Sequence, residues 1–92
     1  MFMKYYDWNE EKNQRLKKER NISFEIIVSC LEEGKMLNKI AHTNSKKYPN
    51  QFIFIIEYEN YAYLVPFIED EEKVFLKTII PSRKATEKYI RR

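Results

Sequence analysis

The sequence predicts an α+β domain in which a small antiparallel sheet packs with two N-terminal helices and one C-terminal helix. Three observations support this fold class. Two capped stretches with helical spacing of apolar residues come first, short runs of β-branched and aromatic residues follow, and a capped basic stretch closes the chain. Because no repeat, linker or low-complexity segment divides the 92 residues, we expect one domain over residues 1–92.

Two helices are expected before the single glycine. Asp7 can act as the N-cap of a helix over residues 8–20, whose thin apolar seam is typical of a surface helix. Ser23 can act as the N-cap of a second helix over residues 24–33, and Gly34 follows where a C-terminal cap needs a positive φ. Apolar residues at helical spacing give this second helix a broad stripe that should anchor the core.

Strands are expected at a short aromatic N-terminal run and in a meander of four. These stretches are residues 2–6, 35–41, 52–58, 61–68 and 73–80. Glu59 and Asn60 separate the two clearest runs by a two-residue connection, which predicts a hairpin. Pro81 should end the last strand because proline cannot donate to the ladder, and Ser82 should then cap a final helix over residues 83–90.

One core should collect large apolar side chains from most of these elements. Its expected members are Trp8, Phe24, Ile27, Leu31, Phe54, Ile56, Leu64 and Ile79. Cys30 has no second cysteine with which to form a disulfide, so we expect it to be a small buried hydrophobe in a reducing compartment.

The distribution of charge is more informative than its total. The formal net charge is +3, from 17 Lys and Arg against 14 Asp and Glu, which is too small to imply a polyanionic partner. From Lys77 onward, however, six basic residues stand against Glu87 alone, while residues 69–72 are all acidic. One side of the molecule should therefore be basic.

Several classes of site are not supported by the sequence. The N-terminus lacks the apolar region of a signal peptide, and no run approaches the ~18 apolar residues of a membrane span, so we expect a cytoplasmic protein without a membrane partner. No spacing of His, Cys, Asp or Glu suggests a metal site, and one glycine cannot form a glycine-rich phosphate loop. No cofactor is expected.

Two separated patterns of residues lie near the ends of the chain. The first comprises Tyr6, Asp7, Trp8, Lys12, Asn13, Lys17, Lys18, Ile22, Phe24 and Glu25. The second comprises Ile79, Ile80, Ser82, Arg83 and Ala85. In residue type and spacing they resemble the BrnT toxins of bacterial type II toxin-antitoxin modules, and the order of the expected elements fits that family from end to end.

The resemblance implies a RelE-like ribonuclease fold and an endoribonuclease that cleaves RNA and so inhibits translation and growth. It also implies a cognate BrnA-like antitoxin as partner, with operator DNA contacted only through that antitoxin. Three positions depart from the family pattern. Lys18, Glu19 and Arg20 stand where the family has Lys-His-Gly. Thr78 replaces an arginine, and Glu87 comes early for the family's late Glu-Arg pair.

Cleavage of RNA by its own 2′-OH needs a proton acceptor, a proton donor and positive charge for the transition state. Arg83 can supply the charge through two parallel donors in the first turn of the last helix, and Ser82 beside it can help to form a phosphate-sized site. His42 is the only histidine and the natural proton carrier, since its ordinary pKa is ~6.5. Arg83, Ser82 and His42 are therefore the candidate catalytic residues of a metal-independent enzyme.

Five lysines are candidate RNA-binding residues: Lys12, Lys17, Lys18, Lys77 and Lys84. The first three lie on the first helix, and a basic groove between this helix and the C-terminal one could hold an RNA backbone. Each candidate also has a plainer interpretation. Lysines on surface helices are usually solvated, a lone loop histidine is usually just exposed, and Pro81-Ser82 can be an ordinary helix start.

Two further functions fit the same residues. The basic surface could hold a nucleic acid or an acidic protein without cutting anything, as in a non-catalytic binding module. Alternatively, an exposed sheet edge could pair with another chain, as in a plain interaction protein. Incubation of labelled RNA with the purified protein separates the three functions. Cleavage favours the endoribonuclease, retention without cleavage favours the binding module, and the absence of both outcomes favours the interaction protein.

Overall fold

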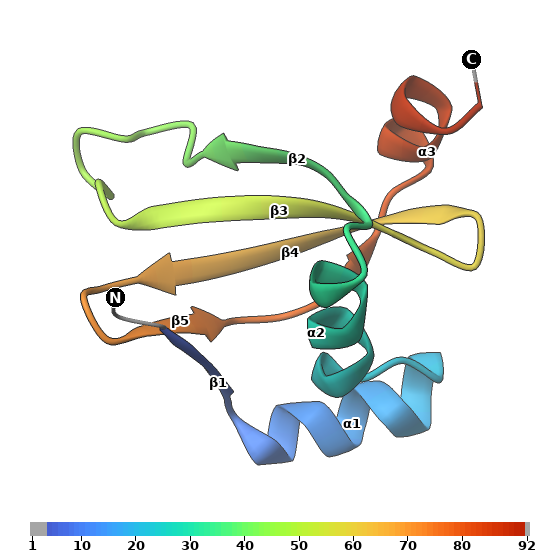
Figure 1. Cartoon of the computed structure of the whole chain (residues 1–92), viewed down its shortest axis with the longest axis horizontal. Coiled ribbons are helices and arrows are strands. Elements are labelled where there is room, and N and C mark those ends of the chain that lie inside the picture. Colours follow the sequence, from blue (N-terminus) through green and yellow to red (C-terminus); the bar gives the residue numbers. More distant parts are fainter. Residues whose placement is uncertain (1–3, 92) are drawn as a thin grey trace.

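The structure is a computed structural model that describes residues 4–91. Its strands and helices follow one another (Figure 1) as β1 (Tyr5–Trp8), α1 (Glu10–Arg20), α2 (Phe24–Glu32), β2 (Met36–Ala41), β3 (Gln51–Tyr58), β4 (Tyr61–Glu69), β5 (Lys73–Leu76), β6 (Ile80–Pro81) and α3 (Arg83–Tyr89). The predicted α+β class is confirmed. Among these described residues, no helix is long and apolar enough to cross a membrane.

The sheet has the strand order β1-β5-β4-β3-β2, and β6 pairs with β4. The meander from β2 to β5 is antiparallel, as predicted. The N-terminal strand β1 lies beside β5 and runs parallel to it, so the complete sheet is mixed. β1 and β2 are consequently the two outer strands of the main sheet.

The turn between β3 and β4 is the predicted two-residue hairpin. Glu59 and Asn60 have φ angles of 51° and 63°, and Tyr58 pairs directly with Tyr61 across the turn. Left-handed conformation at both turn residues matches the right-handed twist of the two strands.

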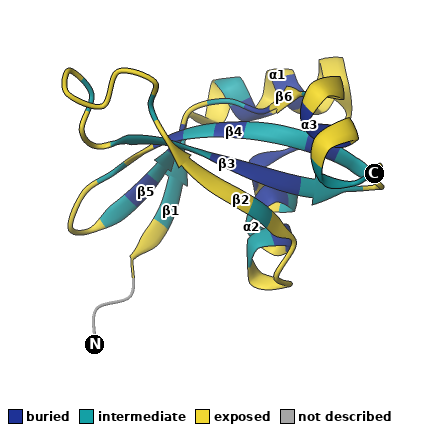
Figure 2. Ribbon diagram, turned by 90° about the horizontal axis from the view of Figure 1, so that it is seen from above, coloured by how far each residue is buried: buried dark blue, intermediate teal, exposed yellow. Residues whose placement is uncertain are grey.

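One face of the sheet is covered by α1 and α2 and contains the main core. Its buried members are Leu16, Ile22, Phe24, Ile27, Cys30, Phe54, Ile56, Val65, Phe67, Val74, Leu76 and Ile79. Figure 2 shows the middle of β3 buried, whereas β2 is exposed along most of its length. Trp8 and Leu31 are partly buried and pack against this core, rather than lying inside it as predicted.

The opposite face of the sheet is covered at one end by α3. Ile55, Ala62 and Ala85 form a small second cluster there, with Leu64 packed against it. The prediction that Leu64 joins the main core is wrong, because Leu64 lies directly opposite Ile55 and paired residues point to the same face.

The strand after the acidic turn is shorter than predicted. β5 ends at Leu76, and the two-residue strand β6 follows, in which Pro81 is paired with Tyr63. The prediction of one strand from 73 to 80, ended by Pro81, is therefore wrong. The physical reason lies in β4, since the next ladder position holds Pro66, which has no N–H to donate.

The first helix begins later than predicted. Residues 5–8 are held extended by their pairing with β5, so Trp8 ends β1 and does not begin the helix. Asn9, not Asp7, is the N-cap, and its Oδ1 accepts the N–H of Lys12 at 2.9 Å. The sequence predicts the N-terminal strand at residues 2–6, of which 2 and 3 lie outside the described residues, and β1 continues to Trp8.

Candidate functional site

The start of α3 is fixed to β4 by a small network of hydrogen bonds. The N–H of Ser82 donates to the carbonyl of Ala62 at 3.0 Å, and Ser82 Oγ accepts the N–H of Ala85 at 3.0 Å. The buried Thr86 hydroxyl donates to the carbonyl of Ser82 at 2.7 Å and accepts the N–H of Ala62 at 2.8 Å. Ser82 is thus the predicted helix cap, and its hydroxyl is engaged in that bond.

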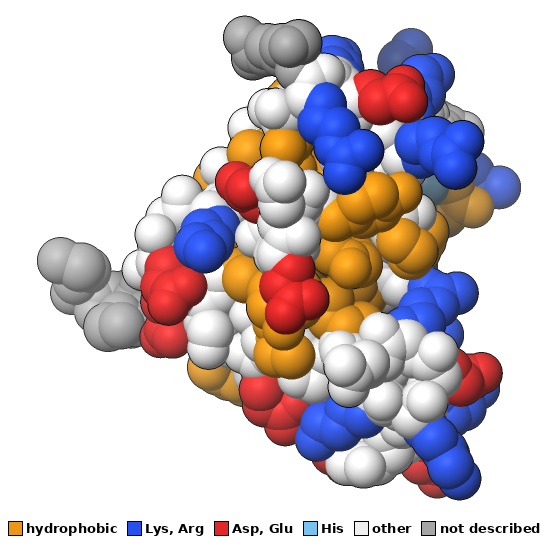
Figure 3. Space-filling view, turned by 90° about the vertical axis from the view of Figure 1, so that its right-hand side faces the viewer, with side chains coloured by type: hydrophobic (Ala, Val, Ile, Leu, Met, Phe, Trp, Pro, Cys, Tyr) orange, Lys and Arg blue, Asp and Glu red, His pale blue; other side chains and the backbone are white. Residues whose placement is uncertain are grey.

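Arg83 and Lys84 follow this cap and are exposed in the first turn of α3. Within residues 4–91, neither side chain takes part in an ion pair or a hydrogen bond, and the same is true of Lys88 and Arg91. Figure 3 shows basic side chains gathered over α3 at the top of the view, above a hydrophobic area. The helix therefore presents unneutralised positive charge next to a rigid backbone.

Arg20 adds a cation that sequence reasoning missed. Its guanidinium donates from Nη1 to the carbonyl of Ile79 at 2.8 Å, four residues before Arg83. The C-terminal end of α1, which also carries Lys17 and Lys18, is thereby held against the segment that leads into α3. No local signal in the sequence marks this contact, because it spans 59 residues of sequence.

The other predicted lysines are spread around the molecule. Lys12 lies in the first turn of α1, at the opposite end of that helix from Arg20. Lys17 forms a long ion pair of 3.8 Å with Glu25, and Lys18 is exposed. Lys77 is exposed in the connection after β5, where its N–H donates to the carbonyl of Pro66 at 2.8 Å. The Arg20 contact holds the end of α1 near the segment before Arg83, but Lys17 is engaged with Glu25 and Lys18 lies about 200° around α1 from Arg20.

His42 is separated from the other candidate catalytic residues. It follows β2 in the connection to β3, and Figure 1 shows this connection at the opposite end of the sheet from α3. Its Nδ1 accepts the N–H of Asn44 at 3.0 Å, and its ring lies 4.6 Å from that of Tyr48. The geometry does not bring His42 together with Arg83 and Ser82.

The acidic run after β4 also lies at the end of the sheet away from α3 (Figure 1). Glu69 pairs with Lys4 at 2.7 Å and with Lys39 at 3.5 Å, and the hydrogen bond from Lys4 lowers the pKa of Glu69. Backbone N–H groups of Lys73 and Glu72 lower the pKa of Asp70. Glu69 and Asp70 are thus engaged locally and, over residues 4–91, form no ion pair with the basic residues of α3.

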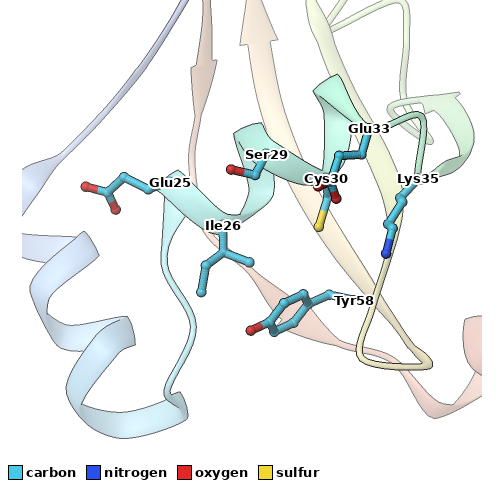
Figure 4. Close-up of a pocket in the computed structure, with 7 residues that line it drawn as sticks. All are labelled: Glu25, Ile26, Ser29, Cys30, Glu33, Lys35 and Tyr58. Atoms are coloured by element: carbon cyan, nitrogen blue, oxygen red, sulfur yellow. The ribbon is translucent and has the colours of Figure 1, made fainter.

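A pocket of about 340 Å³ lies between the outer side of α2 and the end of β3 (Figure 4). It is lined by Glu25, Ile26, Ser29, Cys30, Glu33, Lys35 and Tyr58. Burial raises the pKa of the Cys30 thiol, which makes it a poor nucleophile. Among residues 4–91, no group of His, Cys, Asp and Glu side chains could hold a metal ion.

Tyr63 of β4 lies on the sheet face that packs against the main core, and not on the α3 face, because it pairs with the buried Ile56. It lies opposite Pro81, beside Tyr61 with a ring-centroid distance of 5.8 Å. Burial, followed by the negative charge of Glu59, raises the pKa of Tyr63. A tyrosine with a raised pKa stays protonated near neutral pH, so it can donate a proton but is unsuited to accept one.

Most residues of the two sequence patterns have a structural role. Trp8 stacks on Phe24 with ring centroids 5.6 Å apart, and the buried Asn13 binds the N–H of Phe24. Ser82 caps α3, whereas Arg83 makes no such contact within the described part of the chain. The chain matches no protein-family model, no curated protein and no solved structure.

Proposed function

We propose that this protein is a metal-independent endoribonuclease toxin of the BrnT kind, which acts on RNA in the bacterial cytoplasm and is neutralised by a cognate BrnA-like antitoxin. The observation that carries the proposal is that Arg83 is exposed and has no acidic partner within residues 4–91. Its side chain is exposed on a backbone held by four hydrogen bonds, and no acid within residues 4–91 neutralises it. An exposed arginine on so rigid a base is suited to bind a phosphate group.

The planar guanidinium of Arg83 would bind two oxygens of the scissile phosphate and stabilise the charge that grows during attack by the 2′-OH. Ser82 would act as a positioning residue, because its hydroxyl caps α3 and so fixes the direction of Arg83. Lys84 and the basic end of α1 would contact the flanking phosphates.

The test is incubation of the purified protein with end-labelled RNA in the presence of a chelator. We expect cleavage by the parent and its loss in Arg83→Ala. The matched control is Lys46→Ala, which removes an exposed cation from the connection between β2 and β3. Equal cleavage by the parent and Arg83→Ala would remove the basis of the proposal.

The distance of His42 from α3 favours a second candidate function. Without a histidine beside Arg83, the same cationic surface would hold nucleic acid as a non-catalytic binding module. In that case the labelled RNA would be retained in a salt-dependent manner and would stay intact.

A further inference from the structure

The sheet face that carries α3 is covered over only part of its length. α3 has seven residues, which corresponds to about 10 Å of helix, whereas the eight-residue strand β3 is about 27 Å long. The register places a row of Ile40, Ile53 and Pro66 on this face, followed by a pair of Ile68 and Phe75. These side chains lie beyond the short helix.

The uncovered part of this face exposes large apolar side chains. Ile40 and Ile68 are 39% and 36% exposed, and Ile80 and Tyr5 on the same face are 40% and 54% exposed. Among residues 4–91, five large hydrophobic side chains are exposed, and four of them lie on this face. The fifth, Met36, lies on the other face because it pairs with Ile56. Such a concentration on one face is typical of a docking surface.

A groove of about 300 Å³ runs from this apolar face to α3. Its floor is formed by Ile40, Ile55, Leu64 and Ala85, and its rim includes Lys84 and Lys88. Neither lysine has an acidic partner within residues 4–91. Two further lining residues join β2 to α3, since Asn38 Nδ2 donates to the hydroxyl of Tyr89 at 2.9 Å. The groove therefore combines an apolar floor with a basic rim.

We infer that this face, here called the open sheet face (Ile40, Ile53, Pro66, Ile68 and Phe75), binds an amphipathic helix with an acidic polar side from a partner protein. The helix lies beside α3, buries its apolar stripe on the isoleucines and places Asp or Glu against Lys84 and Lys88. A helix of about 14 residues is roughly 21 Å long, which covers what α3 leaves open. The two helices together would then cover this face as α1 and α2 cover the other.

The charges of the open sheet face favour an acidic helix over a second copy of the chain. Two copies docked through this face would bring Lys84 and Lys88 of each toward those of the other, which costs binding energy. The acids that the register places on this face are Asp7, which is already paired with Lys73 at 3.2 Å, and Glu57 near the hairpin.

The inference does not require the chain to cut RNA. Its consequence for RNA does rest on the proposed function, because Lys84 belongs both to the groove rim and to the expected RNA-binding residues. A docked acidic helix would cover Lys84 and oppose the approach of phosphates by its own charge.

The test uses three labelled synthetic helical peptides and the full chain, with fluorescence anisotropy as the readout and no RNA present. The first peptide has a leucine stripe and Glu on its polar side, the second has the same stripe with Lys, and the third is a scramble of the first. We expect the first to bind most tightly. The double variant Ile40→Gln/Ile68→Gln should weaken it about tenfold or more, whereas Met36→Gln, which changes a more exposed apolar side chain on the other face, should not.

Charge is tested with Lys84→Glu/Lys88→Glu, which should weaken binding of the acidic peptide and strengthen that of the basic one. The control is Lys46→Glu/Lys47→Glu in the β2–β3 connection. Three results would overturn the inference: equal binding of all three peptides, preference for the basic peptide, or unchanged binding by the isoleucine variant. A dimer of the parent chain in sedimentation that dissociates in the isoleucine variant would assign this face to a second copy instead.

Discussion

The side-chain amide of Asn13 donates from Nδ2 to Oε1 of Glu25 at 2.8 Å and so joins α1 to the first turn of α2. The oxygen of the same amide, Oδ1, accepts the backbone N–H of Phe24 at 2.8 Å. This N–H is one of those that have no partner within the helix at a helix start. Asn13 is completely buried although it is polar. One side chain thus fixes the connection between the two helices that cover the main core.

The first prediction concerns the stability that this amide provides. Asn13→Ala leaves the buried N–H of Phe24 without its acceptor, so we expect the free energy of unfolding to fall by about 1–3 kcal/mol. Urea unfolding followed by circular dichroism measures the change. Gln14→Ala is the control, because it removes an exposed amide that bonds only to Glu10. Equal stability of Asn13→Ala and the parent would show that the amide does not fix this connection.

The second prediction concerns the pKa of Glu25. The hydrogen bond from Asn13 is the largest cause that lowers this pKa below its ordinary value of 4.5, and the charge of Lys17 adds to it. A lowered pKa stabilises the fold above the unfolded-state value, and this contribution is lost as the pH falls through the folded-state value. An NMR titration should therefore find a higher Glu25 pKa in Asn13→Ala than in the parent. Identical titration curves would contradict the assigned cause.

The sequence was sufficient for features that depend on local chemistry. Ser23 and Ser82 cap their helices as expected, and Asn60 has the positive φ that the hairpin requires. Features that depend on distant partners were mispredicted. Trp8 continues a strand because β5 lies beside it, and a helix pattern alone cannot reveal that pairing. Likewise, Asn13 reads as an ordinary polar residue on a charged helix until α2 is placed against it.

The third prediction ranks two side chains of α2 by their burial. Ile27 is fully buried, so Ile27→Ala should lower the free energy of unfolding by about 2–5 kcal/mol. Leu31 is only partly buried at the rim of the core, so Leu31→Ala should cost less than Ile27→Ala. Urea unfolding of both variants checks the order. A larger loss for Leu31→Ala would mean that α2 is rotated from its position in the structure.

The fourth prediction concerns the outer strand β2. The backbone N–H of His42 donates to the carbonyl of Gln51 on β3. Because N–H groups alternate in direction along a strand, the N–H of Lys39 points away from β3. Asn38 Oδ1 accepts this outward N–H at 2.8 Å. This bond occupies a backbone donor with which a strand of another chain could pair. It therefore argues against the hypothesis that the protein functions by pairing its sheet edge with another chain. Asn38→Ala should therefore raise self-association measured by light scattering, whereas Asn44→Ala in the adjoining loop should not.

The candidate site was only partly predictable, for a related reason. Arg83 follows a proline and a capping serine, so its place at a helix start is a local property that the sequence contains. The contact of Arg20 with Ile79 spans 59 residues of sequence, and the distance of His42 from Arg83 depends on the strand order. Which cations share a surface is therefore decided by the fold rather than by spacing.

The last prediction separates the geometry of Arg83 from its charge. If the guanidinium binds two phosphate oxygens in the transition state, Arg83→Lys should restore little of the activity lost in Arg83→Ala, since an ammonium is a single point charge. Loss of one such contact typically lowers the rate about a hundredfold or more, so both variants should cleave labelled RNA at least that much more slowly than the parent. Lys84→Ala should instead weaken RNA binding and its salt dependence while leaving the cleavage step nearly unchanged.

Both side chains are exposed, so all three variants should unfold at the temperature of the parent, which serves as the control for folding. Full activity of Arg83→Lys would mean that charge alone is required at this position, and the two-oxygen contact would be wrong. If Lys84→Ala instead abolished cleavage while Arg83→Ala did not, the phosphate contact would belong to the neighbouring residue, about 100° further around α3 on the rim of the apolar groove.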